Sequence, residues 1–504
     1  MYIATAAQQK AADLYTIQKM GVPSLVLMET AANRLMDACP DATRVIIFCG
    51  GGNNGGDGFC LGRLLAQKNK DVTLVRLYAP EKMSPDAQTE YALALRFGVS
   101  VISLEEASAL CGADLVIDAM LGTGQFGAPK GKIAEAVTLY NQMSGIKLAV
   151  DIPTGVNCDI GEVYAPAAKA DLTVCIGSLK YGVLVGEGQK IAGKVILKDI
   201  GIPKEAIDAA GICGTLADAA WAKAHLPVRA LDAHKYSCGN ILVFSGSVGM
   251  TGAPTLAAQG ALYSGAGLVT VAVPSCISNI ISVKLTEPLI LPLSEEGDTF
   301  SSDAGRMALE HMTKTDAALI GPGIKLTPSS AKAMQDFIEK ASCALVIDAG
   351  ALPFTESRPD EKRSTTIITP HRGEAARILD CTVQEINADP VKAAQMLAKK
   401  TGCVSVLKGH PTITATPDGK LYVNTTGNPG MATGGTGDVL AGVITSLIGQ
   451  GIKAAHAAVL GVYLHGLAGD IAAKQKGEHG LCATDVAKAL PVAISITQGK
   501  NVSV

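Results

Sequence analysis

Residues 427–438, GNPGMATGGTGD, combine a glycine-rich loop with a carboxylate at its end. Such a loop needs its glycines so that the backbone can come close to a ligand. The amides of Gly435, Thr436 and Gly437 would then open an apolar helix, whose N-terminus favours an anion. Asp438 would repel that anion, so its presence indicates either a base that removes a proton or a helix cap. The motif by itself leaves both roles open.

A second glycine-rich stretch, GGGNNGGDGF at residues 50–59, follows an expected strand at 44–49 and precedes an expected helix at about 59–67. An α/β domain builds a phosphate or ribose site from this order of strand, loop and helix. Polar side chains that can donate or accept hydrogen bonds stand among the glycines, namely Asn53, Asn54 and Asp57. Six of the first nine residues are glycine, which is more than a plain turn requires.

Strands alternating with helices are expected through the first half of the chain, at 72–77, 115–118, 148–151 and 172–176. This alternation predicts a mostly parallel sheet that is covered on both faces. Two of the strands end in aspartate, Asp118 and Asp151. Because ligands bind beyond the carboxyl ends of such strands, we expect both aspartates to share one pocket with Asn54 and Thr154. Each aspartate could equally cap a helix or form a turn.

The second half repeats the pattern after a junction that we expect within 198–220, where strand signals are few. A new strand at 240–244 leads into SGSVGMTGAP and a helix of small residues. Further strands are expected at 269–273, 317–320, 345–348, 366–369 and 404–407. We therefore predict an α/β protein of two domains, at 1–210 and 225–504.

Three charged or titratable residues of the second half have a functional and a structural interpretation. Lys408 follows a strand and could face phosphates as a point charge, although a lysine in that place is more often solvated. His371 lies three residues before Glu374, which suits the first turn of a helix. His465 lies within an expected helix, and we interpret it as structural.

Composition excludes several classes of protein. Apolar residues make up 48% and charged residues 18%, which is typical of folded α/β domains and not of disorder. The net charge of −3 and the absence of a basic run predict no nucleic-acid partner and no membrane partner. The thirteen cysteines form no CxxC pair and the histidines no HxxxH pair, so we expect reduced thiols and no zinc site. No export signal opens the chain, and we expect a cytoplasmic protein.

The motifs of the two halves carry a resemblance to known families. GGGNNGGDGF, LGTG and DIPTG are similar to the YjeF-type domain of NAD(P)H-hydrate epimerases. SGSVGMTGAP, GPG, TPHRGE, KGHPT and GNPGMATGGTGD resemble the NAD(P)H-hydrate dehydratases. In this order, over nearly the whole chain, they resemble the bacterial bifunctional nicotinamide nucleotide repair family. That resemblance implies an N-terminal Rossmann-like parallel-sheet sandwich and a C-terminal ribokinase-like α/β domain.

The activity implied by the resemblance is the repair of NADH and NADPH that have added water across a nicotinamide double bond. The first domain would interconvert the R and S hydrates, NADHX and NADPHX, with a potassium ion at its site. The second would dehydrate the S hydrate while ADP is converted to AMP and phosphate, with Mg²⁺ bound to the nucleotide. The resemblance alone selects ADP over ATP. We expect these small molecules as the partners of a homo-oligomer.

The resemblance also assigns residues. In the epimerase site, Asp151 is catalytic and the hydrate is contacted by Asn53, Asn54, Gly55, Gly56, Asp57, Gly122, Thr123, Gly124, Gln125, Phe126, Gly127, Ala128 and Asp151. The potassium ligands would be Asn54, Asp118 and Thr154, the last of which is usually serine in the family. In the dehydratase site, Asp438 is catalytic and the hydrate is contacted by Ala253, Gly323, His371 and Asp438. The nucleotide would be bound by Lys408, Gly409, His410, Pro411, Thr412, Gly434, Gly435, Thr436 and Gly437.

Two other functions suit the same motifs. A ribokinase-like kinase that phosphorylates a vitamin or sugar hydroxyl would use Asp438 and its loop in the same way. Such a kinase has no need of a YjeF-type domain with its own nucleotide-sized site. A non-catalytic scaffold is the other alternative, against which the intact Asp118, Asp151 and Asp438 argue.

Overall fold

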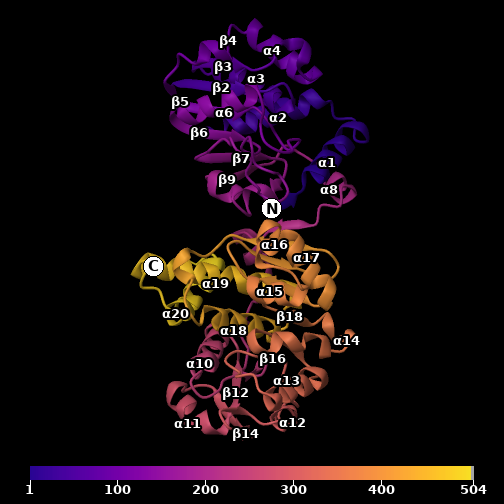
Figure 1. Cartoon of the computed structure of the whole chain (residues 1–504), viewed down its shortest axis with the longest axis vertical. Helices are drawn as coiled ribbons and strands as arrows, with labels where there is room; N and C mark the ends of the chain where they lie inside the picture. The colour runs from indigo at the N-terminus through magenta and orange to yellow at the C-terminus, as the bar shows by residue number, and fades with distance from the viewer. Residues whose placement is uncertain (501–504) are drawn as a thin grey trace. The chain divides into compact units, whose positions relative to one another are not determined.

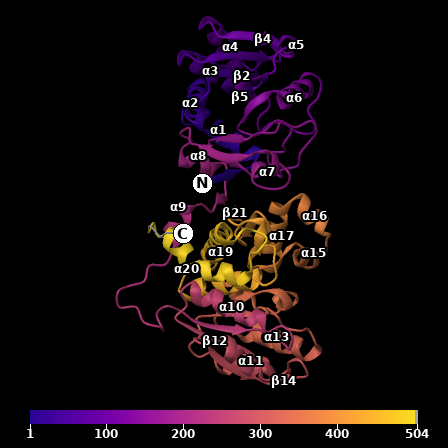
Figure 2. The same ribbon diagram turned by 90° about the vertical axis from the view of Figure 1, so that its left-hand side faces the viewer.

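The structure is a computed structural model that describes residues 1–500, and the chain forms two compact units that meet at Thr215 and Leu216. This boundary falls between the expected domains at 1–210 and 225–504. Figures 1 and 2 follow the chain through both units, from indigo at the N-terminus to yellow at the C-terminus.

The first unit is built on a parallel seven-stranded sheet with the strand order β4-β3-β2-β5-β6-β7-β9. The expected strands at 44–49 and 172–176 are confirmed with the same bounds. The elements of the unit are β1 (Tyr2–Ala4), α1 (Ala6–Gln18), α2 (Ser24–Met36), β2 (Arg44–Cys49), α3 (Asn53–Gln67), β3 (Asp71–Arg76), α4 (Pro85–Arg96), β4 (Ser100–Ser103), α5 (Leu104–Ala107), β5 (Gly112–Ala119), α6 (Lys132–Gln142), β6 (Ser144–Val150), β7 (Leu172–Ile176), β8 (Leu179–Lys180), α7 (Gly188–Ile191), β9 (Lys194–Lys198), α8 (Lys204–Ala209) and β10 (Gly214–Leu216).

Alternate residues of β2 point to opposite faces of this sheet, as strand geometry requires. Val45, Ile47 and Cys49 pack against residues of α2, α3 and α4. Ile46 and Phe48 pack against residues of α6 on the other face. Both faces are covered, which explains why β2 is a continuous apolar run.

The helix after the first glycine loop starts earlier than predicted. α3 begins at Asn53 and not near Phe59, so the loop consists of residues 50–52 alone. Glycines inside the helix serve close packing, because a Cβ at Gly55 would lie 2.0 Å from the carbonyl oxygen of Gly50. A Cβ at Gly58 would likewise lie 2.6 Å from the Cβ of Ala119. The predicted start is wrong because glycine usually signals a loop, whereas here it lets α3 approach the sheet.

Five strands of the first unit were not predicted. β4 and β9 form the two edges of the sheet. β1 pairs parallel with β8, through Ala4 and Lys180, and antiparallel with β10. Strands of two or three residues carry no periodicity from which a sequence pattern could predict them.

The second unit contains a sheet whose strands follow the order β13-β12-β11-β16-β17-β18-β19-β20-β21. Neighbours are parallel from β13 to β19, and β20 and β21 are antiparallel. The elements of the unit are α9 (Ala219–His225), β11 (Asn240–Phe244), α10 (Gly252–Tyr263), β12 (Leu268–Pro274), α11 (Ser275–Lys284), β13 (Leu289–Leu293), β14 (Glu295–Glu296), β15 (Thr299–Phe300), α12 (Ala304–Glu310), β16 (Ala317–Ile320), α13 (Pro328–Lys340), β17 (Ala344–Ile347), α14 (Asp360–Arg363), β18 (Thr366–Ile368), α15 (Arg372–Leu379), α16 (Val383–Ala388), α17 (Pro390–Thr401), β19 (Val404–Leu407), β20 (Thr412–Ala415), β21 (Leu421–Asn424), α18 (Thr436–Gly449), α19 (Ala454–Lys476) and α20 (Ala483–Thr497).

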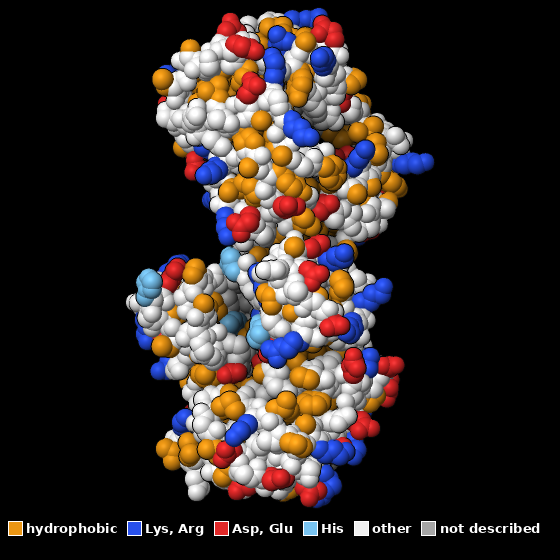
Figure 3. All heavy atoms as spheres, viewed as in Figure 1, with side chains coloured by type: hydrophobic (Ala, Val, Ile, Leu, Met, Phe, Trp, Pro, Cys, Tyr) orange, Lys and Arg blue, Asp and Glu red, His pale blue; other side chains and the backbone are white. Residues whose placement is uncertain are grey.

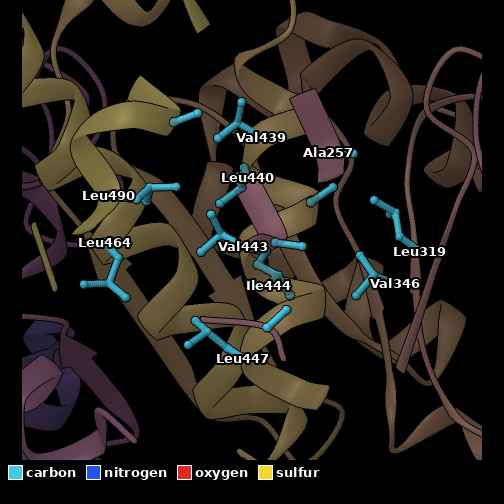
Figure 4. Packing of buried hydrophobic residues seen from close by; sticks show 14 of the residues in the cluster. Ala257, Leu319, Val346, Val439, Leu440, Val443, Ile444, Leu447, Leu464 and Leu490 are labelled. Atoms are coloured by element: carbon cyan, nitrogen blue, oxygen red, sulfur yellow. The ribbon is translucent and has the colours of Figure 1, made fainter. Parts of the chain in front are cut away.

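The helix that follows residues 427–435 lies in the middle of one hydrophobic core of this unit. Seven residues of α18 belong to that core: Val439, Leu440, Ala441, Val443, Ile444, Leu447 and Ile448. The residues around them in Figure 4 come from α10, β16, β17, α19 and α20, and include Ala257, Leu319, Val346, Leu464 and Leu490. The first turn of α18, which carries Asp438, is therefore anchored by the burial of the rest of the helix.

The helices and one face of the surface can be compared with the expectations from composition. No helix within residues 1–500 is both long and apolar enough to span a bilayer. On the face seen in Figure 3, basic and acidic side chains are interspersed and neither sign forms a continuous patch. None of the thirteen cysteines is in a disulfide.

The close contact between α10 and α18 at Gly442 leads to a prediction about the stability of the second unit. A Cβ at Gly442 would lie 2.0 Å from the carbonyl oxygen of Ala257. Gly442→Ala should therefore force the two helices apart and lower the free energy of unfolding by about 1–3 kcal/mol, despite the higher helix propensity of alanine. Trp221, the single tryptophan, lies in this unit, so urea unfolding followed by tryptophan fluorescence measures the change.

The matched control is Gly252→Ala at the start of α10, where nothing lies within 4 Å of the added Cβ. It should leave the unfolding midpoint unchanged or raise it slightly. Equal midpoints for the two variants would contradict the close helix contact.

Candidate active sites

The order of the strands places the first site. From β2 the chain continues to β3 on one side of the sheet, and β5 then pairs on the other side of β2. The loops that leave β2 and β5 therefore diverge, and ligands bind at such a switch point beyond the carboxyl ends of the strands. Residues 50–57 and 118–128 come from these two strands, and Asp151 follows the neighbouring β6.

The three expected potassium ligands meet around one backbone segment. Asp118 Oδ1 accepts hydrogen bonds from Thr154 Oγ1 at 2.8 Å and from Met120 N at 3.0 Å, and Oδ2 accepts one from Thr154 N at 2.7 Å. Thr154 Oγ1 also accepts from Leu121 N at 3.1 Å. Asn54 Nδ2 donates to Leu121 O at 3.0 Å, so its side chain reaches the same residue from α3.

Asp118 is a fully buried carboxylate. Burial raises its pKa to about 6, although the hydrogen bonds from Thr154 and Met120 lower it. No lysine, arginine or histidine within residues 1–500 forms an ion pair with it. A buried carboxylate surrounded by neutral donors and oxygen atoms is the kind of donor set that a monovalent cation fits, because the cation would supply the missing positive charge.

Asp151 is held by a lysine that sequence reasoning missed. Its backbone takes a positive φ of 67° just after β6. Its Oδ1 accepts a hydrogen bond from Ile176 N at 3.0 Å and forms an ion pair with Lys180 Nζ. Asp151 was predicted because it ends a strand, whereas Lys180 lies in a two-residue strand and had no signal in the sequence.

The residues expected from the first turns of α3 differ in exposure. Asn53 is exposed and accepts a hydrogen bond from Ser84 Oγ at 2.9 Å, while Gly55 and Gly56 are buried. Asp57 lies one turn further along. Burial, then the nearby carboxylates of Asp151 and Asp13, raise the pKa of Asp57 well above its ordinary value.

In the loop 122–128, Gln125 connects two loops of the sheet edge. Its Nε2 donates to Val156 O at 2.7 Å, and its Oε1 accepts from Gly155 N at 2.9 Å. Both ends of the Gln125 side-chain amide are therefore already hydrogen-bonded within the protein. The expected contact of Gln125 with the hydrate would have to come from its backbone. Phe126 is instead 79% exposed, and its neighbours Gly124, Gly127 and Ala128 are exposed as well.

A second cluster of possible ligands lies on α2, α3 and α4 but is already neutralised. Glu29, Cys60 and Glu90 are the sole group of three such residues that residues 1–500 bring close together. Arg63 Nη2 lies among them, 3.2 Å from Cys60 Sγ and 3.4 Å from Glu90 Oε2, and it is paired with Glu29. The guanidinium supplies the positive charge that a metal ion would bring.

The second site occupies the corresponding place in the second unit. β12 and β16 flank β11, so the chain again diverges there. Ala253 opens α10 after β11 and Gly323 follows β16, and the two touch: a Cβ at Gly323 would lie 2.7 Å from that of Ala253. Gly323 has a positive φ of 64°, so this contact requires glycine.

The loop that leads into α18 is tied to α19. Asp470 accepts hydrogen bonds from Gly427 N and from Asn428 Nδ2, each at 3.0 Å. At the other end of the loop, Gly435 has a φ of 91° and directs the chain into the first turn of α18. His465, also on α19, is buried, which lowers its pKa to about 4.

Asp438 does not cap α18. It lies in the first turn, but no side chain caps this helix, whose N-cap residue is Gly435. Burial, and then the Asp348 carboxylate, raise the pKa of Asp438 to about 6, while Lys408 lowers it. Asp438 is thus a carboxylate that is ionised at neutral pH and gains a proton only slightly below it.

Lys408 connects Asp438 to a second carboxylate. Its Nζ lies 3.0 Å from Asp348 Oδ1, which also accepts from Thr369 Oγ1 at 2.7 Å. The same Nζ lies 3.5 Å from the position of a Cβ on Gly437, at the first turn of α18. Burial lowers the pKa of Lys408, but the carboxylates of Asp348, Glu374 and Asp438 raise it by more, so the net shift is upward. The lysine therefore lies between strand end and helix instead of in solvent.

The remaining expected residues lie around β18 and β19. His371 caps α15 through Nδ1, which accepts from Gly373 N at 3.0 Å, and Glu374 Oε2 accepts from His371 N at 2.8 Å. The structural interpretation of this pair is confirmed, since His371 Nε2 also lies 3.4 Å from Glu374 Oε1. Thr412 Oγ1 donates to Gly409 O at 2.8 Å and closes the turn KGHPT. Arg372, which sequence reasoning missed, lies 3.2 Å from a Cβ position on Gly409.

Comparison with known proteins identifies both halves. The family described as NAD(P)H-hydrate dehydratase matches residues 241–492, and the family described as YjeF-related protein N-terminus matches residues 24–182. The bifunctional NAD(P)H-hydrate repair enzyme of Moorella thermoacetica is 38% identical over 97% of this chain and 96% of its own length. The chain belongs to the family of bifunctional NAD(P)H-hydrate repair enzymes. Its epimerase domain therefore lies in the first unit and its dehydratase domain in the second.

Other known proteins are similar to the whole chain or to part of it. The bifunctional repair enzyme of Escherichia coli is 32% identical over 95% of this chain and 90% of its own length. A ribokinase-like superfamily protein from Enterococcus faecalis is 25% identical, with a TM-score of 0.50, over 56% of this chain and 97% of that chain. An ADP/ATP-dependent NAD(P)H-hydrate dehydratase from Bacillus subtilis, co-crystallised with ATP and Mg²⁺, is 30% identical over 56% of this chain and 98% of that chain, with a TM-score of 0.49. The predicted fold class of two α/β domains is confirmed.

Asp348 should set the pH range in which the dehydratase works. Because the Asp348 carboxylate raises the pKa of Asp438, Asp348→Asn should lower that pKa and shift the acid limb of the dehydration rate to lower pH. The variant should also lose about 1–3 kcal/mol of stability, since Lys408 loses its buried partner. The measurement is the rate of recovery of NADH absorbance from the S hydrate as a function of pH.

Asp418→Asn is the control, because Asp418 pairs with Lys420 at 3.0 Å on an exposed turn of the same unit. It should leave the pH profile unchanged. A profile of Asp348→Asn that coincides with that of the wild type would show that Asp348 does not act on the reaction.

Proposed function

We propose that the second unit dehydrates the S hydrate of NADH or NADPH while converting ADP to AMP and phosphate, with Asp438 as the base. The observation that carries this proposal is the position of Asp438. Its carboxylate lies in the first turn of α18 without capping the helix, beside the glycine loop and next to Lys408. A helix N-terminus binds the phosphates, and a carboxylate with a raised pKa accepts a proton near neutral pH.

The reaction would begin with phosphoryl transfer to the hydrate. Asp438 would accept the proton of the C6 hydroxyl while the hydroxyl oxygen attacks the β-phosphorus of ADP. The bond from that phosphorus to the bridging oxygen would break and release AMP. The amides of Gly435, Thr436 and Gly437 and the Lys408 ammonium would balance the charge on the transferred group.

Elimination would complete the repair. The bond between C6 and the phosphate oxygen breaks with electrons from the ring nitrogen, and loss of a proton from C5 restores the dihydropyridine double bond. Phosphate is a far better leaving group than hydroxide, which is why a nucleotide is consumed. Ala253, Gly323 and His371 would hold the hydrate during these steps.

Mg²⁺ would reach this site together with the nucleotide. Within residues 1–500, the second unit brings no three His, Cys, Asp or Glu side chains together as metal ligands. Phosphate oxygens and water would be the main ligands of Mg²⁺, as is usual for this ion. Nucleotide contacts would come from Lys408, Gly409, His410, Pro411, Thr412, Gly434, Gly435, Thr436 and Gly437.

The first unit would epimerise the hydrates. Asp151 would act beside the substrate, which residues 53–57 and 122–128 would contact. Potassium would be held by Asn54, Asp118 and Thr154, where it would supply the positive charge that the buried Asp118 lacks. Thr154 provides the hydroxyl oxygen that serine would otherwise provide.

Removal of the Asp438 carboxylate tests the dehydratase. Asp438→Asn should bind ADP as the wild type does and lose dehydration of the S hydrate by about 10²–10⁴-fold, the usual contribution of a general base. Purified protein is mixed with hydrated NADH and with ADP or ATP, and recovery of the dihydronicotinamide absorbance is followed. Absence of recovery by the wild type with either nucleotide would overturn the proposed function.

The control is Asp485→Asn. Asp485 also lies in the first turn of a helix in this unit, but it caps α20 by accepting from Cys482 N at 3.1 Å. This variant should keep full turnover. If the two variants lose activity equally, Asp438 has only a structural role.

Potassium removal tests the first site. Exchange of K⁺ for tetramethylammonium should lower the epimerisation rate by about tenfold or more and lower the melting temperature of the first unit in calorimetry. Thr154→Ala should weaken both effects of K⁺. Equal epimerisation and equal melting in the two salts would contradict a potassium site at Asn54, Asp118 and Thr154.

A further inference from the structure

Lys180 is a buried lysine whose three N–H groups all have acceptors. Its side chain has no exposed surface. Its Nζ donates to Ile176 O at 2.8 Å and to Ser178 O at 2.9 Å, and it pairs with Asp151 Oδ1. Lysine is almost never fully buried unless a partner balances its charge. The position of the ammonium is therefore tied to Asp151.

Asp151 is held through one oxygen only. Oδ1 accepts from both Ile176 N and Lys180 Nζ, while Oδ2 accepts no hydrogen bond from residues 1–500. The side chain retains 15% of its exposure, so this carboxylate is not sealed from solvent. The positive φ of 67° is uncommon for a residue with a side chain, and these two bonds hold the residue in that conformation.

The N-terminal elements β1 and α1 hold the segment that carries Lys180. Ala4 of β1 pairs with Lys180 of β8. Ser178 Oγ bonds Gln9 Oε1 on α1, and Gln9 Nε2 donates to Asp13 at 2.8 Å. The charged and titratable groups around the ammonium are Asp151, Cys175 and Cys158, with Asp13 and Asp57 close by. Burial lowers the pKa of Lys180, but Asp151 and Cys175 raise it, and the net shift is upward.

We propose that Lys180 is a positioning residue of the epimerase: its ion pair turns the free oxygen of Asp151 toward the hydrate and balances the charge of that carboxylate. The inference rests on the proposed role of Asp151. Opening of the hydrate ring would break the bond between C6 and the ring nitrogen. One proton would move from the C6 hydroxyl oxygen to that nitrogen, and C6 would become an aldehyde carbon. Closure on the opposite face returns the proton, and a carboxylate fixed beside the ring can carry it both ways.

Variants of Lys180 test this role in the full chain. Lys180→Met should lower the rate of conversion of R to S hydrate by about 10–100-fold, the loss expected from a misplaced catalytic group. Dehydration of the S hydrate by the second unit should be unchanged, which serves as an internal measure of active protein. Hydrate epimers are separated by chromatography in the absence of ADP.

A double-mutant cycle separates positioning from a structural role. If Lys180 acts through Asp151, Asp151→Asn with Lys180→Met should be no slower than Asp151→Asn alone. Lys180→Arg keeps the charge and should keep epimerisation closer to the wild-type rate than Lys180→Met does.

The matched control is Lys147→Met. Lys147 is a part-buried lysine of the same unit whose Nζ bonds the carbonyl oxygens of Tyr140 and Met143 and no carboxylate. It should leave epimerisation unchanged. If Lys180→Met does not fold, as judged by limited proteolysis, Lys180→Gln replaces it, since the amide can still donate to the Ile176 and Ser178 carbonyls.

Four outcomes are decisive. Additive losses in the double mutant, or a folded Lys180→Met or Lys180→Gln protein with the epimerisation rate of the wild type, would overturn the positioning role. A wild-type protein that does not interconvert the hydrates would instead overturn the proposed epimerase function. We expect Lys180→Met to lower the epimerisation rate by itself and to cause no further loss in a protein that already carries Asp151→Asn.

Discussion

In each unit a lysine that is buried or partly buried balances a carboxylate at the end of a strand. Lys180 pairs with Asp151, and Lys408 lies between Asp348 and Asp438. A charge removed from water is tolerated only beside an opposite charge or fixed dipoles, so these pairs decide which carboxylate oxygens remain free for a substrate. Asp118 is the exception, because its buried carboxylate is surrounded by neutral donors alone. That difference is the physical basis of the cation proposed at Asp118 and of the proton-transfer roles proposed for Asp151 and Asp438.

The two sites also rely on backbones that approach one another closely. Gly55 and Gly58 let α3 lie against the sheet, and Gly442 lets α18 lie against α10. α18 is thereby buried along most of its length, so the turn that carries Asp438 cannot move away from Lys408 without loss of core packing. The cost of exposing such a core is large compared with the energy of one ion pair, which makes the site rigid before any ligand binds.

Local pattern was enough for the strands that carry the site. β2, β7, β11, β16 and β19 have the bounds that their apolar runs predicted, because a strand buried on both faces must be a continuous apolar segment. The loops that leave them were found because glycine and aspartate cluster there. The same reasoning failed at α3, where glycine serves packing, and at β1, β8 and β10, where two or three residues show no period. It also left Asp438 open between cap and base, since both roles use the same residue in the same turn.

The sequence alone determined the two α/β domains, the glycine loops and the carboxylates that end strands, because these are properties of consecutive residues. Tertiary structure decided which charges meet. Lys180 reaches Asp151 only because β8 is held beside β1 and the end of β7. Asp348 acts on Asp438 only because β17, β19 and the start of α18 converge on Lys408. Electrostatic effects depend on distance through space and on burial, and neither quantity is recorded in the order of the residues.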